Sequence, residues 1–327
     1  GGGGVSIMSY FSQSYSAYSA KERACKAKMH FQDFIAMPLF AAFYLVLAKY
    51  AMRSGDAAAC VARAAVAPEW IVYLAGACAI AGLVVMYQQV AVIPFPLEIS
   101  SNWAAVQPVG RWIFLTRQTL MLQAVHLCYT FAGHLGYLDD ELACAVAASS
   151  VFFSGLGIFV MIQFFALVVP NAQFLSDIVQ WKERGVPAFE HLVIFAHVPC
   201  GILALVDVAL LQDRALLLAM TPTKQVRACA TYQAVPPSAR LTLFSPFALP
   251  RTLSLQHLAL TCVCYAVCYV IFMHLNFYAT KCWPYGFMNG FGTANAKWFI
   301  FTISQTSIMV SFVAIAFATM TYAPQVW

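Results

Sequence analysis

The sequence predicts an all-α protein, a polytopic transmembrane helix bundle with about seven spans. Hydrophobic residues make up 62% of the 327-residue chain and charged residues only 9%, which excludes a soluble globular protein. Long stretches are nearly free of charge, and each can supply the roughly 20 apolar residues that a helix needs to cross a bilayer. These stretches lack the alternation of a membrane β-barrel, so only helices can satisfy the backbone inside lipid.

The predicted spans follow one another along the chain. They cover residues 34–52, 71–97, 118–138, 142–176, 190–214, 252–280 and 298–327. The first contains Lys49, which can snorkel to the interface, and Pro38, which a helix tolerates in its first turn. Glycine, proline and acidic residues separate the spans, as expected of turns. Residues 33–327 should therefore form a single transmembrane domain.

Two segments outside the spans have distinct compositions. Residues 1–32 are rich in Ser and Tyr and then basic, which predicts an interfacial arm beside anionic lipid headgroups. Residues 213–252 contain five prolines and should form a long loop. A loop of this length favours a surface shaped to partners.

The distribution of charges and of potential metal ligands excludes some classes of function. The formal net charge of +5 is spread along the chain, so we expect membrane lipids as partners and no nucleic acid. Cys262, Cys264 and Cys268 fall on different helical faces, and no helix carries a widely spaced histidine pair with matching partners on another helix; we therefore expect no metal or other cofactor. His134 and Asp139 match the H-x4-D spacing of glycerolipid acyltransferases, a two-residue pattern that occurs often by chance.

Polar residues inside spans are candidates for function because the membrane makes them costly. Thr116 and His197 lie about 6 and 15 Å along two helices that enter from the same side, so they could meet in one cavity. An imidazole beside a hydroxyl can remove its proton during attack on an ester. The alternative is structural, because membrane threonines usually bond their own i−4 carbonyl. Asp207 lies about 15 Å beyond His197 and needs another partner, for which a His or Asn of span 252–280 is our expectation.

Three blocks carry a resemblance to a known family. They run Gly110-Arg-Trp-Ile-Phe-Leu-Thr116, His197-Val-Pro-Cys-Gly-Ile-Leu-Ala-Leu-Val-Asp207, and from Tyr269 to Trp283-Pro-Tyr285. In this order they resemble the androgen-induced gene family, which includes the androgen-dependent TFPI-regulating protein and consists of membrane threonine hydrolases. The resemblance covers roughly residues 110–325 and implies a six-helix core, to which residues 34–52 would add a peripheral helix.

The resemblance also implies an activity and its residues. Thr116 would be the nucleophile and His197 its general base, acting on fatty acid esters of hydroxy fatty acids. Trp112, Asp207, Trp283 and Tyr285 would contact substrate or lipid, with Trp283 and Tyr285 at the headgroup level. The Thr116 hydroxyl and the imidazole should then lie within about 5 Å of each other.

A second function stays open. Ile113, Val198 and Asp207 differ from the residues that the family shows at these positions, and the loops are reshaped. The chain could instead be a non-catalytic accessory subunit of a large, respiratory-type membrane complex, with lipid in the remnant cavity. Segment 213–252 and the amino-terminal arm would then contact the other subunits. A Ser-rich, acid-poor amino terminus suits the mitochondrial inner membrane, with an endomembrane as the alternative.

Overall fold

A computed structural model gives the fold. It describes residues 19–52, 67–92, 98, 100, 102–184, 189–212, 253–292 and 295–322, and these form helices, turns and short connections without a strand. The predicted all-α class is confirmed. Segment 213–252 and residues 1–18, on which the expected partner contacts depend, lie outside the described residues.

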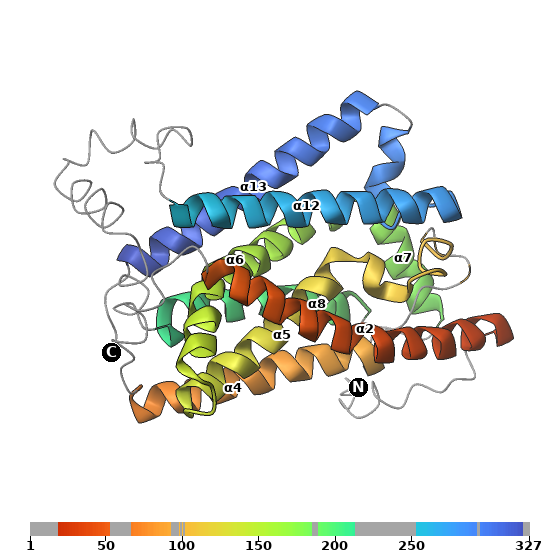
Figure 1. Ribbon diagram of the computed structural model, residues 1–327. Coiled ribbons are helices and arrows are strands. Elements are labelled where there is room, and N and C mark those ends of the chain that lie inside the picture. Colours follow the sequence, from red (N-terminus) through yellow and green to blue (C-terminus); the bar gives the residue numbers. More distant parts are fainter. Residues whose placement is uncertain are drawn as a thin grey trace, which may run out of the picture.

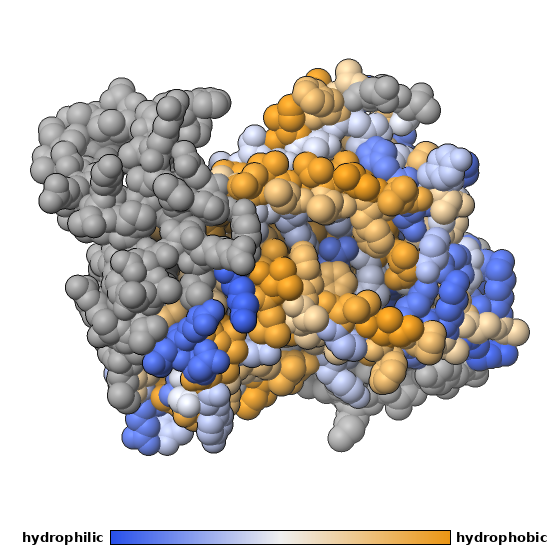
Figure 2. All heavy atoms as spheres, in the orientation of Figure 1, coloured by the Kyte–Doolittle hydropathy of each residue, from blue (hydrophilic) through white to orange (hydrophobic). Residues whose placement is uncertain are grey.

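In the part of the chain that the structure describes, six helices are long and apolar enough to cross a membrane. They are α2 (Ala20–Met52), α4 (Glu69–Tyr87), α6 (Asp140–Gln163), α8 (Phe189–Val206), α12 (Leu253–Thr280) and α13 (Asn295–Tyr322). Figure 2 shows hydrophobic residues over the middle of the visible face and hydrophilic ones toward its right-hand edge and lower left. The chain is therefore a multi-pass integral membrane protein.

The remaining predicted span, 118–138, is also present as a helix, but its composition differs from that of the six helices above. It is α5 (Leu115–His134), which is 20 residues long and is not among the described helices apolar enough to cross a membrane. Its polar side chains, including Gln118, Gln123 and His126, are buried inside the protein. The sequence located this helix correctly, but other helices shield its polar groups from the membrane.

Helix α2 is longer and more integrated than the sequence suggested. Residues 20–32, expected in a separate arm, are the first part of one continuous helix. Ser19 and Glu22 form a reciprocal capping box, with the Glu22 N–H donating to Ser19 Oγ and the Ser19 N–H to Glu22 Oε2, which fixes its start. Pro38 consequently lies in the helix interior. Many α2 side chains are exposed, yet Asp33 and Tyr44 are buried, so α2 contributes to the core.

Helix α6 lies at the centre of the bundle and packs against α2, α5, α8 and α13. Two glycines on α6 allow this closeness. A Cβ at Gly155 would lie 2.6 Å from the Val313 Cα of α13, and one at Gly157 would lie 2.8 Å from the Cys200 carbonyl oxygen of α8. In Figure 1, α12 and α13 lie on one side of this centre and α2 and α4 on the other.

The predicted span 142–176 is divided. Helix α6 continues into the π-helical turn η4 (Phe164–Val168), and after Pro170 the short helix α7 (Ala172–Glu183) begins. Asn171 caps α7 by accepting a hydrogen bond from the Gln173 N–H. Similar π-helical turns, η2 (Gln88–Val92) and η5 (Asp207–Leu211), extend α4 and α8. Such turns often mark functional regions.

Candidate functional site

The structure brings Thr116 and His197 together. Thr116 is the second residue of α5, directly after the 3-10 turn η3 (Gly110–Ile113), and His197 lies on α8. Gly110 starts η3 with a φ of 63°, a conformation that glycine adopts at low cost. Thr116 Oγ1 lies 3.0 Å from His197 Nε2. The expected separation of less than about 5 Å is confirmed.

Two contacts fix the His197 ring. Nδ1 lies 2.7 Å from the Val193 carbonyl oxygen, one helical turn earlier. Because a carbonyl can only accept, Nδ1 carries the hydrogen, and Nε2 of the neutral ring must accept from the Thr116 hydroxyl. The ring also stacks on Phe164 of η4, with centroids 3.6 Å apart and planes 13° apart. The imidazole is therefore held in the tautomer that a general base requires.

The structural alternative for Thr116, a bond to its own i−4 carbonyl, does not occur. That carbonyl belongs to Trp112 and accepts from Gln118 Nε2 at 2.7 Å. The i−3 carbonyl, of Ile113, accepts from the Tyr269 hydroxyl at 2.9 Å. The hydroxyl is left to His197 as its hydrogen-bond partner.

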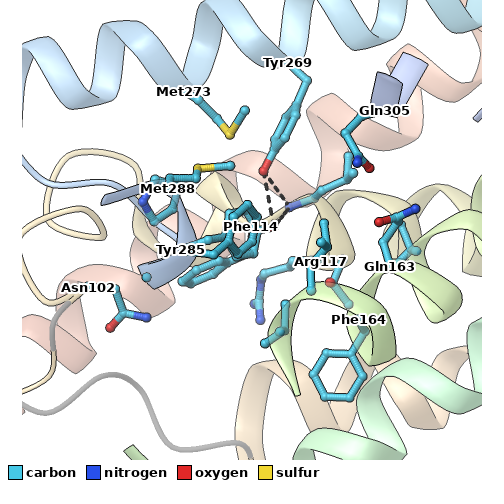
Figure 3. A pocket seen from close by; sticks show the side chains of 18 of the residues that line it. Asn102, Phe114, Arg117, Gln163, Phe164, Tyr269, Met273, Tyr285, Met288 and Gln305 are labelled. Atoms are coloured by element: carbon cyan, nitrogen blue, oxygen red, sulfur yellow. Dashed lines mark hydrogen bonds between the residues drawn. The ribbon is translucent and has the colours of Figure 1, made fainter. Parts of the chain in front are cut away.

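Thr116 and His197 line a cavity of about 310 Å³, shown in Figure 3. Its wall is mostly apolar, with side chains such as Phe159, Val160 and Met309 from α6 and α13. Helix α7 and the turn after α12 also contribute to the lining, through Phe174 and Tyr285 among others. A long apolar ligand suits such a wall.

Two tyrosines meet at the start of α5. The Leu115 N–H donates to the hydroxyls of Tyr285, at 2.9 Å, and Tyr269, at 3.1 Å. These two hydroxyls are 3.3 Å apart, and Figure 3 shows both side chains converging on this point. Burial raises the pKa of Tyr285 above the ordinary tyrosine value, so its hydroxyl stays protonated and can donate.

Asp207 has a different partner from the one expected. Its Oδ2 lies 2.8 Å from His126 Nε2 on α5, and His126 Nδ1 lies 3.0 Å from the Tyr44 hydroxyl on α2. Ser154 and Gln212 also donate to this carboxylate. The expectation of a His or Asn from span 252–280 was wrong, because α5 places His126 directly opposite η5. The buried carboxylate is thereby satisfied.

Of the four residues expected to contact substrate, Tyr285 lines the cavity, whereas Trp112, Asp207 and Trp283 are not among its lining residues. Trp112 is buried, and its indole N–H donates to Asp33 Oδ1 at 2.9 Å. Trp283 is 5% exposed and stacks on Phe277 with centroids 4.0 Å apart. Trp283 thus packs inside the protein and does not present its ring at the surface.

The rival motifs do not assemble into sites. His134 contacts the Leu211 carbonyl oxygen, whereas Asp139 caps α6 by accepting from the Leu142 N–H. Cys262 is buried while Cys264 and Cys268 are exposed. Among the described residues there is no group of three or more His, Cys, Asp or Glu side chains that could hold a metal ion.

Several lining residues escaped the sequence reasoning. Tyr269 and Phe164 carry no signal that distinguishes them from core aromatics, although Tyr269 lies within one of the three family-like blocks. Arg111 lies between predicted spans, and Asp33, its ion-pair partner, is the first residue of the predicted transmembrane domain and directly precedes span 34–52. One signal for this ion pair was available in the sequence. Arg117 borders an apolar segment, and a guanidinium buried there requires a carboxylate partner.

Fold and site together define a multi-pass integral membrane protein with a paired hydroxyl and imidazole in an internal cavity. No protein-family model, curated protein or solved structure matches the chain.

Proposed function

We propose that this protein hydrolyses carboxylic esters of long-chain lipids, with Thr116 as nucleophile and His197 as general base. The single observation that carries the proposal is the 3.0 Å contact from Thr116 Oγ1 to His197 Nε2 at the wall of an apolar cavity. A hydroxyl that donates to a neutral imidazole is the arrangement that activates a weak nucleophile.

The residues define a two-step reaction. Thr116 Oγ1 attacks the ester carbonyl carbon while its proton passes to His197 Nε2, and the imidazolium then returns this proton to the departing alkoxide. The acyl group remains on Thr116 as an ester. A water molecule, deprotonated by His197, attacks that ester, and the imidazolium returns the proton to the departing Thr116 oxygen, which releases the fatty acid and restores the threonine.

The start of α5 offers donors for the oxyanion of the tetrahedral intermediate. The Thr116 N–H belongs to the first turn of the helix, where N–H groups lack intrahelical acceptors, and the positive end of the helix dipole points the same way. Tyr269 uses its one proton on the Ile113 carbonyl oxygen, so Tyr285 has its own proton available for the cavity or for the Tyr269 oxygen. Such donors usually contribute strongly to ester hydrolysis.

The androgen-induced gene family is the family to which we assign the chain in this proposal, and fatty acid esters of hydroxy fatty acids are the proposed substrates. Support comes from the matching Thr116 and His197 positions, together with a cavity suited to acyl chains. Asp207 would support the fold through His126, since it does not contact His197. The third group of the proposed site is then the Val193 carbonyl, which orients the imidazole.

Purified protein in detergent tests the proposal. We expect release of fatty acid from a hydroxy-fatty-acid ester and covalent labelling by a fluorophosphonate probe. Thr116→Ala should reduce turnover by roughly 10³-fold or more and abolish labelling. Thr302→Ala is the matched control, because it removes a hydroxyl from the same cavity wall but not one beside the imidazole. Equal loss in both variants, or full labelling of Thr116→Ala, would contradict the proposal.

A further inference from the structure

Two buried arginines share one carboxylate at the wall of the cavity. Arg117 Nη2 lies 2.6 Å from Asp33 Oδ1, and Arg111 Nη2 lies 3.6 Å from Asp33 Oδ2. Both arginines line the cavity that contains Thr116. The three side chains together carry a net charge of +1, in a place where burial makes an unbalanced charge costly.

The Arg117 guanidinium has more donors than its protein partners use. The side chain is 2% exposed. Its Nη1 donates to the Gln89 carbonyl oxygen at 2.8 Å, and its Nη2 faces Asp33. Its Nε has no hydrogen-bond partner among the described residues. A guanidinium has five N–H donors, and leaving buried donors unpaired is unfavourable.

The part of the lining near η2 includes polar side chains, while the centroid of the Trp112 ring lies 5.2 Å from the Arg117 guanidinium carbon. Gln89, Ser100 and Asn102, from η2 and the connection to α5, line the cavity together with the arginines. Figure 3 shows the Arg117 side chain between Tyr285 and Phe164, among the residues that line the cavity. Asp33 itself is not among the lining residues; the acidic residue of the described lining is Asp177 on α7, and burial raises the pKa of its carboxyl, which favours the uncharged form.

We infer that Arg117, supported by Arg111, binds the anionic headgroup of a lipid whose chain occupies the cavity. The shared chemistry is a compact anion, a carboxylate or a phosphate monoester, which guanidinium groups hold through paired hydrogen bonds. This inference deepens the proposed function and rests on it for the ester. The substrate would be an ester lipid that also carries a free anionic group, with the ester at Thr116 and the anion at Arg117.

Binding to the full-length Thr116→Ala protein in detergent tests the anion site without turnover. The probes are palmitic acid, its uncharged methyl ester and hexadecyl phosphate, above the pH at which the acid ionises. We expect palmitate to bind about tenfold or more tightly than methyl palmitate, as for a hydrogen-bonded charge. Whichever of palmitate and hexadecyl phosphate binds with the higher affinity identifies the headgroup as a carboxylate or a phosphate. Equal affinities for all three probes overturn the inference.

Two substitutions break the same ion pair with opposite consequences for charge. Arg117→Gln leaves Arg111 and Asp33 as a neutral pair, so the preference for acid over methyl ester should disappear. Asp33→Asn leaves two guanidinium groups, so that preference should persist or increase. A purely structural role predicts the same effect from both variants, and that result would count against an anion site. If Arg117→Gln does not fold, the comparison of the three probes on the Thr116→Ala protein still shows whether the cavity prefers an anion.

Failure of the inference and of the proposed function can be told apart. Preference for palmitate without any ester hydrolysis by the unsubstituted protein would leave the anion site standing and remove the hydrolase. The opposite result is also distinguishable. If a hydroxy-fatty-acid ester and its carboxyl-methylated form are hydrolysed at equal kcat/KM, the hydrolase stands and the anion site is removed.

Discussion

At the scale of single residues, Tyr285 carries a testable part of the proposed chemistry. Its hydroxyl accepts from the Leu115 N–H at 2.9 Å and keeps a proton to donate toward the cavity. Tyr285→Phe should lower kcat by roughly 10²-fold with little change in KM, because an oxyanion donor acts in the transition state. The Leu115 N–H retains the Tyr269 hydroxyl as an acceptor, so the fold should persist.

Tyr265→Phe is the control for this prediction. Tyr265 lines the same cavity and is buried, but its hydroxyl donates to Gln118 Oε1. Steady-state kinetics of both variants, with thermal unfolding midpoints measured alongside, separates a catalytic from a structural effect. An equal fall in kcat for the two variants would remove Tyr285 from the proposed oxyanion site.

Distant polar residues show where residue-level sequence reasoning succeeded and where it failed. Thr116 and His197 could be paired from the sequence because their two helices enter from the same side and because the family resemblance implies the pair. Asp33, Tyr44 and His126 could not be connected to their partners, since helix rotation and helix neighbours decide those contacts. A sequence shows that a buried carboxylate needs a partner, but only packing determines which one.

At the scale of elements, α6 packs closely against α8, the helix that carries His197. A Cβ at Gly157 would lie 2.8 Å from the Cys200 carbonyl oxygen and 2.8 Å from Gln123 Nε2, and Gln123 itself donates to that carbonyl. Gly157→Ala should therefore push α8 away from α6. We expect a loss of about 1–3 kcal/mol in stability, visible as a lower thermal midpoint, and weaker fluorophosphonate labelling of Thr116.

Gly290→Ala provides the comparison for Gly157→Ala. Among the described residues, no atom outside its own chain neighbours lies within 4 Å of a Cβ placed there, so its midpoint and labelling should match those of the unsubstituted protein. If Gly157→Ala behaves like Gly290→Ala, the close packing of α6 on α8 does not control the site.

Helix positions were predictable because charge-free stretches mark them, and each of the seven predicted stretches contains a helix. Helix ends and roles were less predictable. The capping box at Ser19 starts α2 well before its apolar part, and Pro170 separates α7 from the apolar run of α6. α5 shows the limit most clearly. Its lack of charge from residue 118 onward predicted a membrane span like the others, whereas its amides and imidazoles require burial among other helices.

At the scale of the whole molecule, the apolar exterior must be shielded from water by lipid or by other proteins. Large hydrophobic side chains are exposed on α2, α4, α12 and α13, among them Phe34, Tyr73, Leu275 and Phe299. Lipid alone covers such a surface for a membrane enzyme that acts by itself, whereas an accessory subunit would bury part of it against other chains. The two functions therefore differ in the size of the particle that leaves the membrane.

Blue-native electrophoresis of the source membrane, whether mitochondrial inner membrane or endomembrane, measures that size. For the proposed hydrolase, we expect the chain to migrate near its mass of 35.9 kDa plus bound detergent, after extraction in digitonin as well as in dodecyl maltoside. Association through the 213–252 segment would instead give co-migration with a large complex in digitonin. Such co-migration favours the accessory subunit, and labelling of the Thr116 hydroxyl within that complex would show that a subunit can retain the hydrolase chemistry.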